Sequence, residues 1–380
     1  MTTQQPIEVT CPQCHCTVAV PPLSHRQKAK CPRCQHTLFV YYKAQYERLC
    51  ALAISGLIFL FLALPFNFLS FKAAGQSRTI HLADGISVML ELDAYTLAIV
   101  TTIATLVLPG LVLCGFIVLS IARLIRHKSD FIARVHRMVN IMLPWSMAEV
   151  FLVGTLVSLI KITEQADLSI GLSFYAFVLF TMCTSACSLF YNSNDYLFWL
   201  NSYFPKPKPI TPQSAAFSIQ RTWALLLTAA LLYIPANTYP IMRTEVFGSE
   251  ESNTILGGVI RLWESGSYPV AIIILVASVF IPILKIFIIG WLTYTLNRDT
   301  TGTNETRMKY YRFTAYIGRW SMVDVFVVAI LVSLLQTGNT LSVYPGAAAL
   351  AFCAVVLLTM LAGMTFDSRL IWLSGKKIHD

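Results

Sequence analysis

Charged side chains are scarce in this sequence of 380 residues: they make up only 12% of it, whereas soluble domains carry about 25%. Hydrophobic residues make up 56%. This composition excludes an ordinary soluble globular protein and indicates a polytopic membrane protein. The sequence also lacks a P-loop, an HExxH motif and a GxSxG motif. The sequence therefore contains no motif for nucleotide hydrolysis and no hydrolase nucleophile. We expect that the protein is not an enzyme.

The sequence contains long apolar runs. Each of eight runs is near or above the roughly 20 residues that a helix needs to cross a bilayer. An even number of spans puts both chain ends on one side, and no secretory signal peptide is expected. The predicted spans are residues 51–71, 95–122, 138–160, 169–191, 221–241, 268–296, 313–336 and 343–366.

The basic residues predict the orientation. The segments before span 1, between spans 2 and 3, 4 and 5, and 6 and 7, and after span 8 hold 21 of the 28 lysines and arginines, counting Arg221 at the start of span 5. The loops on the opposite side hold five. The positive-inside rule then places both termini in the cytoplasm. The net charge of +9 is explained by this topology, so no nucleic-acid partner is expected.

An internal repeat divides the chain. "WSMAEVF" at 145–151 recurs as "WSMVDVF" at 320–326, and further matches on both sides keep the same order. We predict two copies of a four-helix module at 46–200 and 216–375, joined by a proline-rich cytoplasmic linker at 201–215. Because four is even, the copies have parallel orientations, related by an axis along the membrane normal.

Each module also contains a long loop after its first helix. The stretches "FLSFKAAGQSRTIHLADG" and "YPIMRTEVFGSEESNTILGG" each place a Gly-containing turn between short β-prone runs. These stretches predict small extracytoplasmic hairpins. The fold class is therefore an all-α polytopic membrane protein with eight transmembrane helices in two parallel repeats. A short interfacial helix is expected after each hairpin.

The N-terminal 45 residues carry the strongest motif. Two CPxC pairs give the pattern C-x2-C-x16-C-x2-C, which is typical of a four-thiolate zinc ribbon. Four protein ligands leave no open position, so we predict a structural zinc that holds together a cytoplasmic segment at 1–45 too small to build a core. A pair of redox disulfides is the alternative, and a neighbouring His15, Cys16, His25 or His36 is a possible substitute ligand. The predicted ligands are Cys11, Cys14, Cys31 and Cys34.

Ionisable residues inside spans are costly and mark functional sites. Lys285 and Asp324 each lie about 11 residues from the cytoplasmic end of consecutive spans, or ~17 Å at 1.5 Å per residue. An ion pair between them near mid-membrane is feasible. It is either a titratable pair that gates a cavity or carries protons, or a static pair that fixes helix register. Arg319, nearer the end of the span, is expected to reach the headgroups or to cap carbonyls.

The two modules differ at these positions. The counterparts of Lys285 and Arg319 in the first module are Val112 and Pro144, while Glu149 stands where the second module has Asp324. We therefore expect the working site in the second module. Ser278 and Thr359 are candidates for the same polar network, although each alone is more often a helix-packing hydroxyl.

The chain resembles the paraquat-inducible protein A (PqiA/LetA) family of bacterial inner-membrane proteins over nearly its whole length. The resemblance is carried by the paired CPxC knuckles, "LPFN" and "IPANTYPI", "NTILGGV", "IPILK", "IGRWSMVDVF" and "DSRLIW". By motif match, the family's polar in-span residues fall on Lys285, Asp324, Ser278 and Thr359. Family members often carry a second ribbon before the second module, but residues 192–220 contain no cysteine here.

The resemblance implies a function. It implies a Gram-negative inner-membrane subunit that loads or extracts phospholipid for transfer between the two membranes. It also implies a periplasmic tunnel partner with MCE (mammalian cell entry) domains. The titratable pair suggests coupling to protons. Two alternatives remain: a stand-alone proton-coupled exporter of small molecules, and a passive membrane anchor for the tunnel. A membrane thiol oxidoreductase ranks last, because Cys183 and Cys187 are poorly placed in span 4.

Overall fold

The computed structural model describes residues 7–21, 23–73, 76–82, 84–92, 94–163, 167–203, 211–246, 249–296, 304–334 and 341–372. Among them, eight helical segments are long and apolar enough to cross a membrane. The protein is therefore a mostly helical, multi-pass membrane protein, as the composition predicts. The eight segments are Gln45–Ala63, Tyr95–Ile125, Asp130–Leu159, Leu172–Phe190, Pro212–Thr238, Tyr268–Thr295, Asn304–Val332 and Ala347–Thr365.

The same order of elements occurs twice. The first copy contains α1 (Gln45–Ala63), α2 (Asp84–Glu91), α3 (Tyr95–Thr102), η1 (Ile103–Val107), α4 (Leu108–Ile125), α5 (Asp130–Met142), η2 (Leu143–Trp145), α6 (Ala148–Thr163), α7 (Leu172–Phe190) and α8 (Ser193–Trp199). The second contains α9 (Pro212–Thr238), α10 (Ile255–Glu264), α11 (Tyr268–Leu275), η4 (Val276–Phe280), α12 (Ile281–Thr295), α13 (Asn304–Ile317), η5 (Gly318–Met322), α14 (Val323–Leu334), α15 (Ala347–Thr365) and η6 (Ser368–Trp372).

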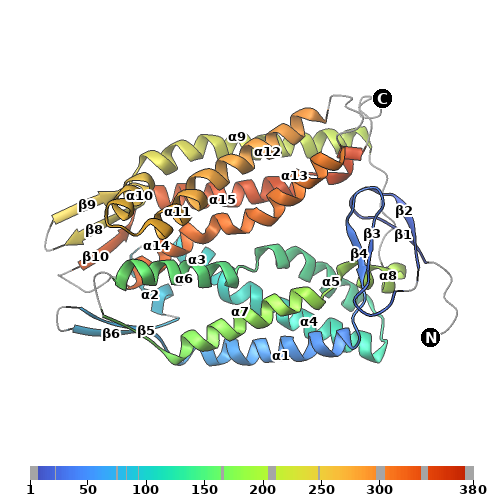
Figure 1. Ribbon diagram of the computed structural model, residues 1–380, viewed down its shortest axis with the longest axis horizontal. Helices are drawn as coiled ribbons and strands as arrows, with labels where there is room; N and C mark the ends of the chain where they lie inside the picture. The colour runs from blue at the N-terminus through green and yellow to red at the C-terminus, as the bar shows by residue number, and fades with distance from the viewer. Residues whose placement is uncertain are drawn as a thin grey trace.

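Both predicted hairpins are present, and each gains a third strand. In the first copy β5 (Asn67–Ala73) pairs with β6 (Gln76–His81) and also with β7 (Asp167–Ile170). In the second copy β8 (Met242–Val246) pairs with β9 (Ser249–Asn253) and with β10 (Leu341–Pro345). All pairs are antiparallel. The third strand ties the loop before the fourth span to the loop after the first span. Figure 1 shows both sheets at the same end of the molecule, opposite the chain termini.

The second and third spans of each copy are irregular in the middle. A π-helical turn, η1 or η4, lies between the two halves of the second span, just before a proline. A short 3₁₀ turn, η2 or η5, divides the third span into two helices. The spans predicted at 138–160 and 313–336 are both present, and each is interrupted by one of these turns. Pro144 lies inside η2 and Gly318 begins η5, so each break coincides with a residue that disfavours an α-helix.

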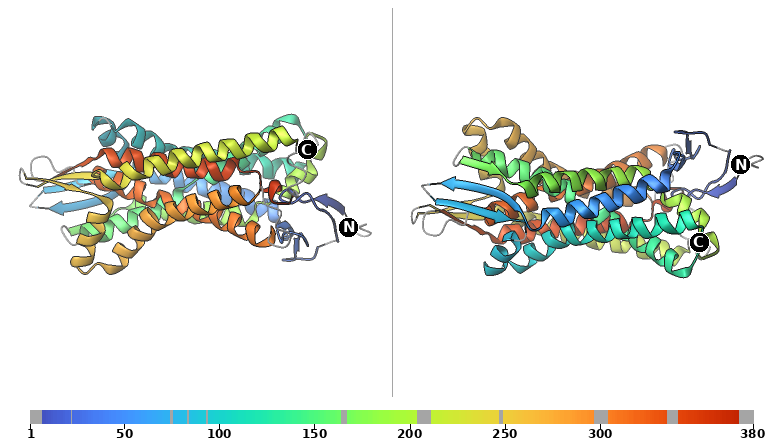
Figure 2. Two further views of the ribbon diagram at one scale, coloured as in Figure 1. Left: turned by 90° about the horizontal axis from the view of Figure 1, so that it is seen from above. Right: turned by 90° about the horizontal axis from the view of Figure 1, so that it is seen from below.

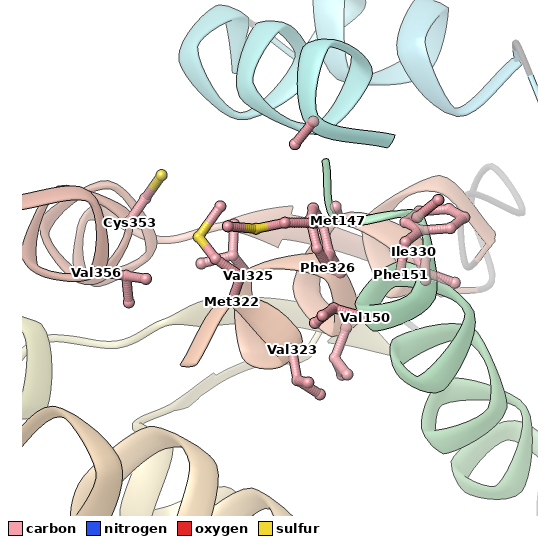
Figure 3. Packing of buried hydrophobic residues seen from close by; sticks show 14 of the residues in the cluster. Met147, Val150, Phe151, Met322, Val323, Val325, Phe326, Ile330, Cys353 and Val356 are labelled. Carbon is pink, nitrogen blue, oxygen red and sulfur yellow. The ribbon is translucent and has the colours of Figure 1, made fainter. Parts of the chain in front are cut away.

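The repeated WSMxxVF stretches meet at the interface between the modules. Phe151 on α6 and Phe326 on α14 are equivalent residues of the two copies, and their rings pack edge to face with centroids 5.6 Å apart. Figure 3 shows these two residues together with Met147, Val150 and Met322 in one buried cluster. A contact between equivalent residues is what an isologous, twofold interface produces. The repetition of this stretch thus supplies both sides of one interface.

The start of the second copy shows how sequence sets a helix end. Thr211 caps α9, and its hydroxyl accepts a hydrogen bond from the backbone N–H of Ser214, whose hydroxyl in turn accepts one from the backbone N–H of Thr211. This arrangement is a capping box. It contains Pro212 at the first helical position, which suits the fixed φ angle of proline. The helix therefore begins nine residues before the predicted span 221–241, inside the predicted linker; residues 204–210 of that linker lie outside the described residues.

Two equivalent glycines permit the close packing beneath the sheets. A Cβ atom added to Gly346 would lie 2.1 Å from the backbone oxygen of Pro240, and one added to Gly171 would lie 1.9 Å from that of Asn67. Both neighbours are backbone atoms, so the chain itself would have to move. We expect Gly346→Ala to lower the free energy of unfolding by about 1–3 kcal/mol, the usual cost of overpacking. The apparent melting temperature of the purified protein measures this.

Gly258→Ala is the matched control for this substitution. Gly258 lies inside α10, and an added Cβ there meets no atom within 4 Å. Alanine favours a helix over glycine by about 1 kcal/mol, so this variant should be as stable as the wild type or slightly more so. Equal melting temperatures for both variants would show that the contact between Gly346 and Pro240 is not tight.

Candidate functional site

Four cysteine sulfurs converge in the N-terminal domain. The strands β1 (Ile7–Thr10) and β2 (Thr17–Val20) form one antiparallel hairpin, and β3 (Lys28–Lys30) and β4 (Thr37–Val40) form another. Each hairpin presents two buried cysteines at its turn, and the four sulfurs lie within 4.8 Å of one another. The Sγ–Sγ distances are 3.6 Å for Cys11 and Cys34 and 3.5 Å for Cys14 and Cys31.

This geometry fits a tetrahedral metal site. With metal–sulfur bonds of about 2.3 Å, the edges of a tetrahedron are ~3.8 Å long. The separations are too long for disulfides, and all four cysteines are free. Burial raises the pKa of Cys11 to about 11 and raises that of Cys14 as well. Without a cation these buried thiols stay protonated at neutral pH, so the arrangement can hold a metal ion that displaces their protons.

The backbone of each turn aims the sulfurs. The N–H of His15 donates to the carbonyl of Cys11, and the N–H of Gln35 donates to the carbonyl of Cys31, at 2.9 and 2.8 Å. His15 and Gln35 have φ angles of 54° and 60°, so the chain reverses through the left-handed region directly after each second cysteine. In the described part of the chain, the cluster consists of the four cysteines and includes none of the alternative ligands. Burial, together with the positive charge of Arg312, lowers the pKa of His36 to about 4.

The metal-binding domain contacts both modules. Arg312 on α13 donates two hydrogen bonds to Oε1 of Gln13, at 2.9 and 2.5 Å. On the other side, Asn194 on α8 donates to the backbone oxygen of Leu38 at 3.0 Å. The guanidinium of Arg33 also lies 4.7 Å above the ring of Trp372. Figures 1 and 2 show this domain at the end of the helices that carries both chain termini.

A second candidate site surrounds the break in the third span of the second module. Lys285 on α12 is 2% exposed, and its Nζ has no hydrogen-bonding partner among the described residues. A Cβ built on Gly318 would lie 3.8 Å from both Cε and Nζ of Lys285. The ammonium group therefore packs against the backbone at the start of η5. A buried charge without a partner is expensive, so this position is a candidate functional site.

Three of the sequence-predicted residues share one cavity. Lys285, Arg319 and Thr359 line a cavity of about 310 Å³ together with Pro144 of the first module and Met360. Thr359 is fully buried, and its hydroxyl donates to the backbone oxygen of Val356 at 3.0 Å. The cavity is thus walled by both modules and holds basic and apolar groups side by side. No aspartate or glutamate is among its lining residues in the described chain.

No hydrogen bond joins Lys285 to Asp324, because Nζ of Lys285 has no hydrogen-bonding partner among the described residues. Asp324 is 5% exposed and lies in the first turn of α14, beyond the helix break. A carboxylate there is favourably placed in the field of the helix N-terminus. The pairing of the two residues stays a prediction.

The remaining predicted residues lie outside this cavity. Ser278 is fully buried in the π-helical turn η4, and its hydroxyl has no hydrogen-bonding partner among the described residues. Glu149 is exposed at the start of α6, where it accepts a hydrogen bond of 2.5 Å from the hydroxyl of Ser185. It belongs to a separate place in the first module. The two copies therefore use their equivalent acids differently.

The sequence analysis missed two residues at the break. Ser321 is fully buried in η5, and its hydroxyl also lacks a partner among the described residues. Gly318 lies beside Lys285, and a Cβ added there would make ordinary contact with Cε and Nζ at 3.8 Å. The η5 turn packs against both η4 and α12, so it brings unpaired polar groups from three segments into one region. Pro144 in the first module and Gly318, one residue before the position equivalent to Pro144, are the signal that could have revealed the break.

Comparisons with known proteins agree with the repeat. A sequence model of the family described as "Paraquat-inducible protein A" matches residues 46–200 and again residues 219–375. The chain is 34% identical to "Intermembrane transport protein PqiA" of Escherichia coli, over 96% of this chain and 95% of that protein. It is 28% identical to "Probable intermembrane transport protein" of Haemophilus influenzae, over 97% and 96%.

A further relative also matches over most of its length. The chain is 28% identical to "Lipophilic envelope-spanning tunnel protein A" of Escherichia coli, over 95% of this chain and 90% of that protein. No solved structure matches the chain. The matches on both modules and the relative of 34% identity over nearly the full length lead to one conclusion. The chain belongs to the paraquat-inducible protein A family.

Proposed function

We propose that this protein is an inner-membrane subunit of a lipid transport system that moves phospholipid between the inner and outer membranes of a Gram-negative envelope. The observation that supports this most strongly is the buried, unpartnered Lys285 in a cavity between two modules, at a broken helix. Transporters often place substrate sites at broken helices near the membrane midplane. Two relatives are named as intermembrane transport proteins, which favours a transport function for this chain as well.

The chemistry of the cavity suits a phospholipid headgroup. A phosphate diester carries one negative charge, and the ammonium of Lys285 and the guanidinium of Arg319 both line the cavity. A volume of about 310 Å³ is enough for a headgroup but not for acyl chains, which would remain between the modules or in the bilayer. Proton coupling is part of this proposal. Asp324 and Lys285 are separately buried, and their protonation would change as the modules move.

The proposed partner and orientation follow the same reasoning. A periplasmic tunnel with MCE domains would receive the lipid, and the three-stranded sheets at one end of the molecule are the parts nearest to it. The basic loops support an orientation with both termini in the cytoplasm. The metal held by the four cysteines is proposed to be zinc, which prefers tetrahedral thiolate sites. Its role would be structural.

Complementation tests this function. A strain lacking this protein and its paralogues should become sensitive to detergent, and the wild-type chain at normal expression should restore resistance. Failure to restore it would contradict the proposal. Transport of small molecules by the purified chain alone in liposomes would favour the stand-alone exporter instead. An anchor without transport activity would restore resistance even when Lys285 is replaced.

A further inference from the structure

A large cavity lies beneath the metal-binding domain, the N-terminal domain with the four cysteines. It has a volume of about 940 Å³ and is bounded by that domain, by α5 and by the end of α7 and start of α8. Figure 1 shows these elements together at the end of the molecule where the chain begins. None of the residues that line it in the described chain is an aspartate or glutamate. The sequence-predicted sites do not include this cavity.

The cavity has a basic side and an apolar side. Lys28 of the metal-binding domain and Arg137 of α5 both line it. Exposed apolar side chains line it as well, among them Ile141, Leu189 and Met364. Basic groups next to an apolar wall at a helix end match the boundary between lipid headgroups and acyl chains. A small soluble anion would gain nothing from the apolar wall.

The repeat shows that Arg137 lacks the partner that its equivalent has. Arg137 corresponds to Arg312, whose guanidinium is occupied by two hydrogen bonds to Gln13. Gln13 also borders the cavity, but Arg137 makes no hydrogen bond or ion pair with any described residue. Lys28 likewise has no ion pair with a described residue. Two positive charges thus line one cavity without a counter-charge among the described residues.

The cavity leads toward Lys285. Met364 of α15 lines both this cavity and the one around Lys285. Along α5 and the η2 turn that follows it, Arg137, Ile141 and Pro144 recur at intervals of four and three residues. The first two line the cavity beneath the metal-binding domain, and Pro144 lines the cavity around Lys285. The distance along the chain axis from Arg137 to Pro144 is about 10 Å at 1.5 Å per residue.

We propose that this cavity binds the phosphate of an anionic phospholipid drawn from the leaflet on the side of the metal-binding domain, and delivers it along α5 and Met364 to the cavity of Lys285. This proposal adds a lipid-binding site to the proposed function, and it rests on that function for the direction in which the lipid moves. Arg137 and Lys28 recognise the phosphate, and the apolar wall holds the first part of the acyl chains. A free phosphate shares the anionic group but not the chains.

Equilibrium lipid binding tests the proposal. The purified full chain is equilibrated in mixed micelles with equal mole fractions of phosphatidylglycerol and phosphatidylcholine, repurified, and its bound lipid is quantified. We expect the wild type to enrich phosphatidylglycerol at least fivefold, and the double variant Lys28→Gln, Arg137→Gln to enrich it less than twofold. Arg137→Lys should keep most of the preference because it keeps the charge.

The matched control is Arg134→Gln. Arg134 is an exposed arginine on the same helix that does not line the cavity. This variant removes one positive charge from the same helix and should retain the wild-type preference. An equal loss in the control and the double variant would overturn the proposal, because it would show only general attraction of anionic lipid to a basic surface. Arg137-dependent binding of inorganic phosphate without any preference for phosphatidylglycerol would overturn it as well.

This readout is independent of transport. The preference is measured on isolated protein, so it can be absent while the wild-type chain still restores detergent resistance; then the cavity proposal fails and the transport proposal stands. It can also be present in a chain that restores nothing, which rejects transport but not binding. Comparable melting temperatures of all variants confirm that the comparison is between folded proteins.

Discussion

Replacing Lys285 by methionine is expected to abolish restoration of detergent resistance while leaving the protein as stable as the wild type or more stable. Methionine has nearly the same length as lysine without the ammonium. The ammonium is buried and has no hydrogen-bonding partner among the described residues, so its removal relieves a desolvation cost. Replacement of buried charges by apolar groups of similar size is often stabilising by about 1–4 kcal/mol. Opposite effects on function and stability identify a residue kept for function.

The repeat provides matched controls for this experiment. Asp324→Asn should also abolish function, whereas Glu149→Gln changes the equivalent acid of the first module and should not. Glu149 is exposed and bonded to Ser185, outside the cavity that holds Lys285. Lys309→Ala removes an exposed lysine on α13 and should have no effect. If well-expressed Lys285→Met protein restores full resistance, the lysine is a structural feature and the anchor becomes the better explanation.

Hydrophobicity and repeat symmetry made most of this fold predictable. Span positions depend on the apolar content of about 20 residues, which the sequence displays directly. The clustering of the four cysteines was predictable because a two-residue spacer lets both cysteines of a pair direct their sulfurs at one ion. The breaks at η2 and η5 were not predicted, since the residues on both sides of each break stay apolar. The mean hydropathy of a stretch of residues does not change when a turn interrupts the helix without changing its composition.

The contacts of the candidate site were harder to predict. Depth along two helices suggested that Lys285 and Asp324 could pair, but depth does not fix the rotation of a helix. The break places Asp324 beyond η5 while Gly318 faces Lys285. The docking of the metal-binding domain on Arg312 and Asn194 depends on contacts between residues more than 150 positions apart. Such contacts leave no local pattern in a single sequence.

Removal of the metal is expected to unfold the N-terminal domain and leave the transmembrane helices intact. The two hairpins have strands of only three or four residues, and the core between them consists largely of the four cysteines and Leu38. In small zinc-binding peptides the metal contributes about 10–16 kcal/mol to folding at neutral pH. Cys31→Ser should therefore eliminate protection of residues 7–40 from hydrogen exchange, and a strong chelator should do the same to the wild type.

The consequences of metal loss should extend to both modules. The folded domain holds Arg312 of the second module through Gln13, and Asn194 of the first through the backbone of Leu38. Because residues 192–220 offer no second cysteine pair, we expect these contacts to be the link between the modules that depends on a bound metal. Exchange should therefore also increase at the end of α13 nearest Arg312 and in α8. Cys16→Ser, which changes a half-buried thiol outside the four-sulfur cluster, should preserve protection at all three places. Protection that survives in Cys31→Ser would show that the hairpins fold and join the modules without a metal.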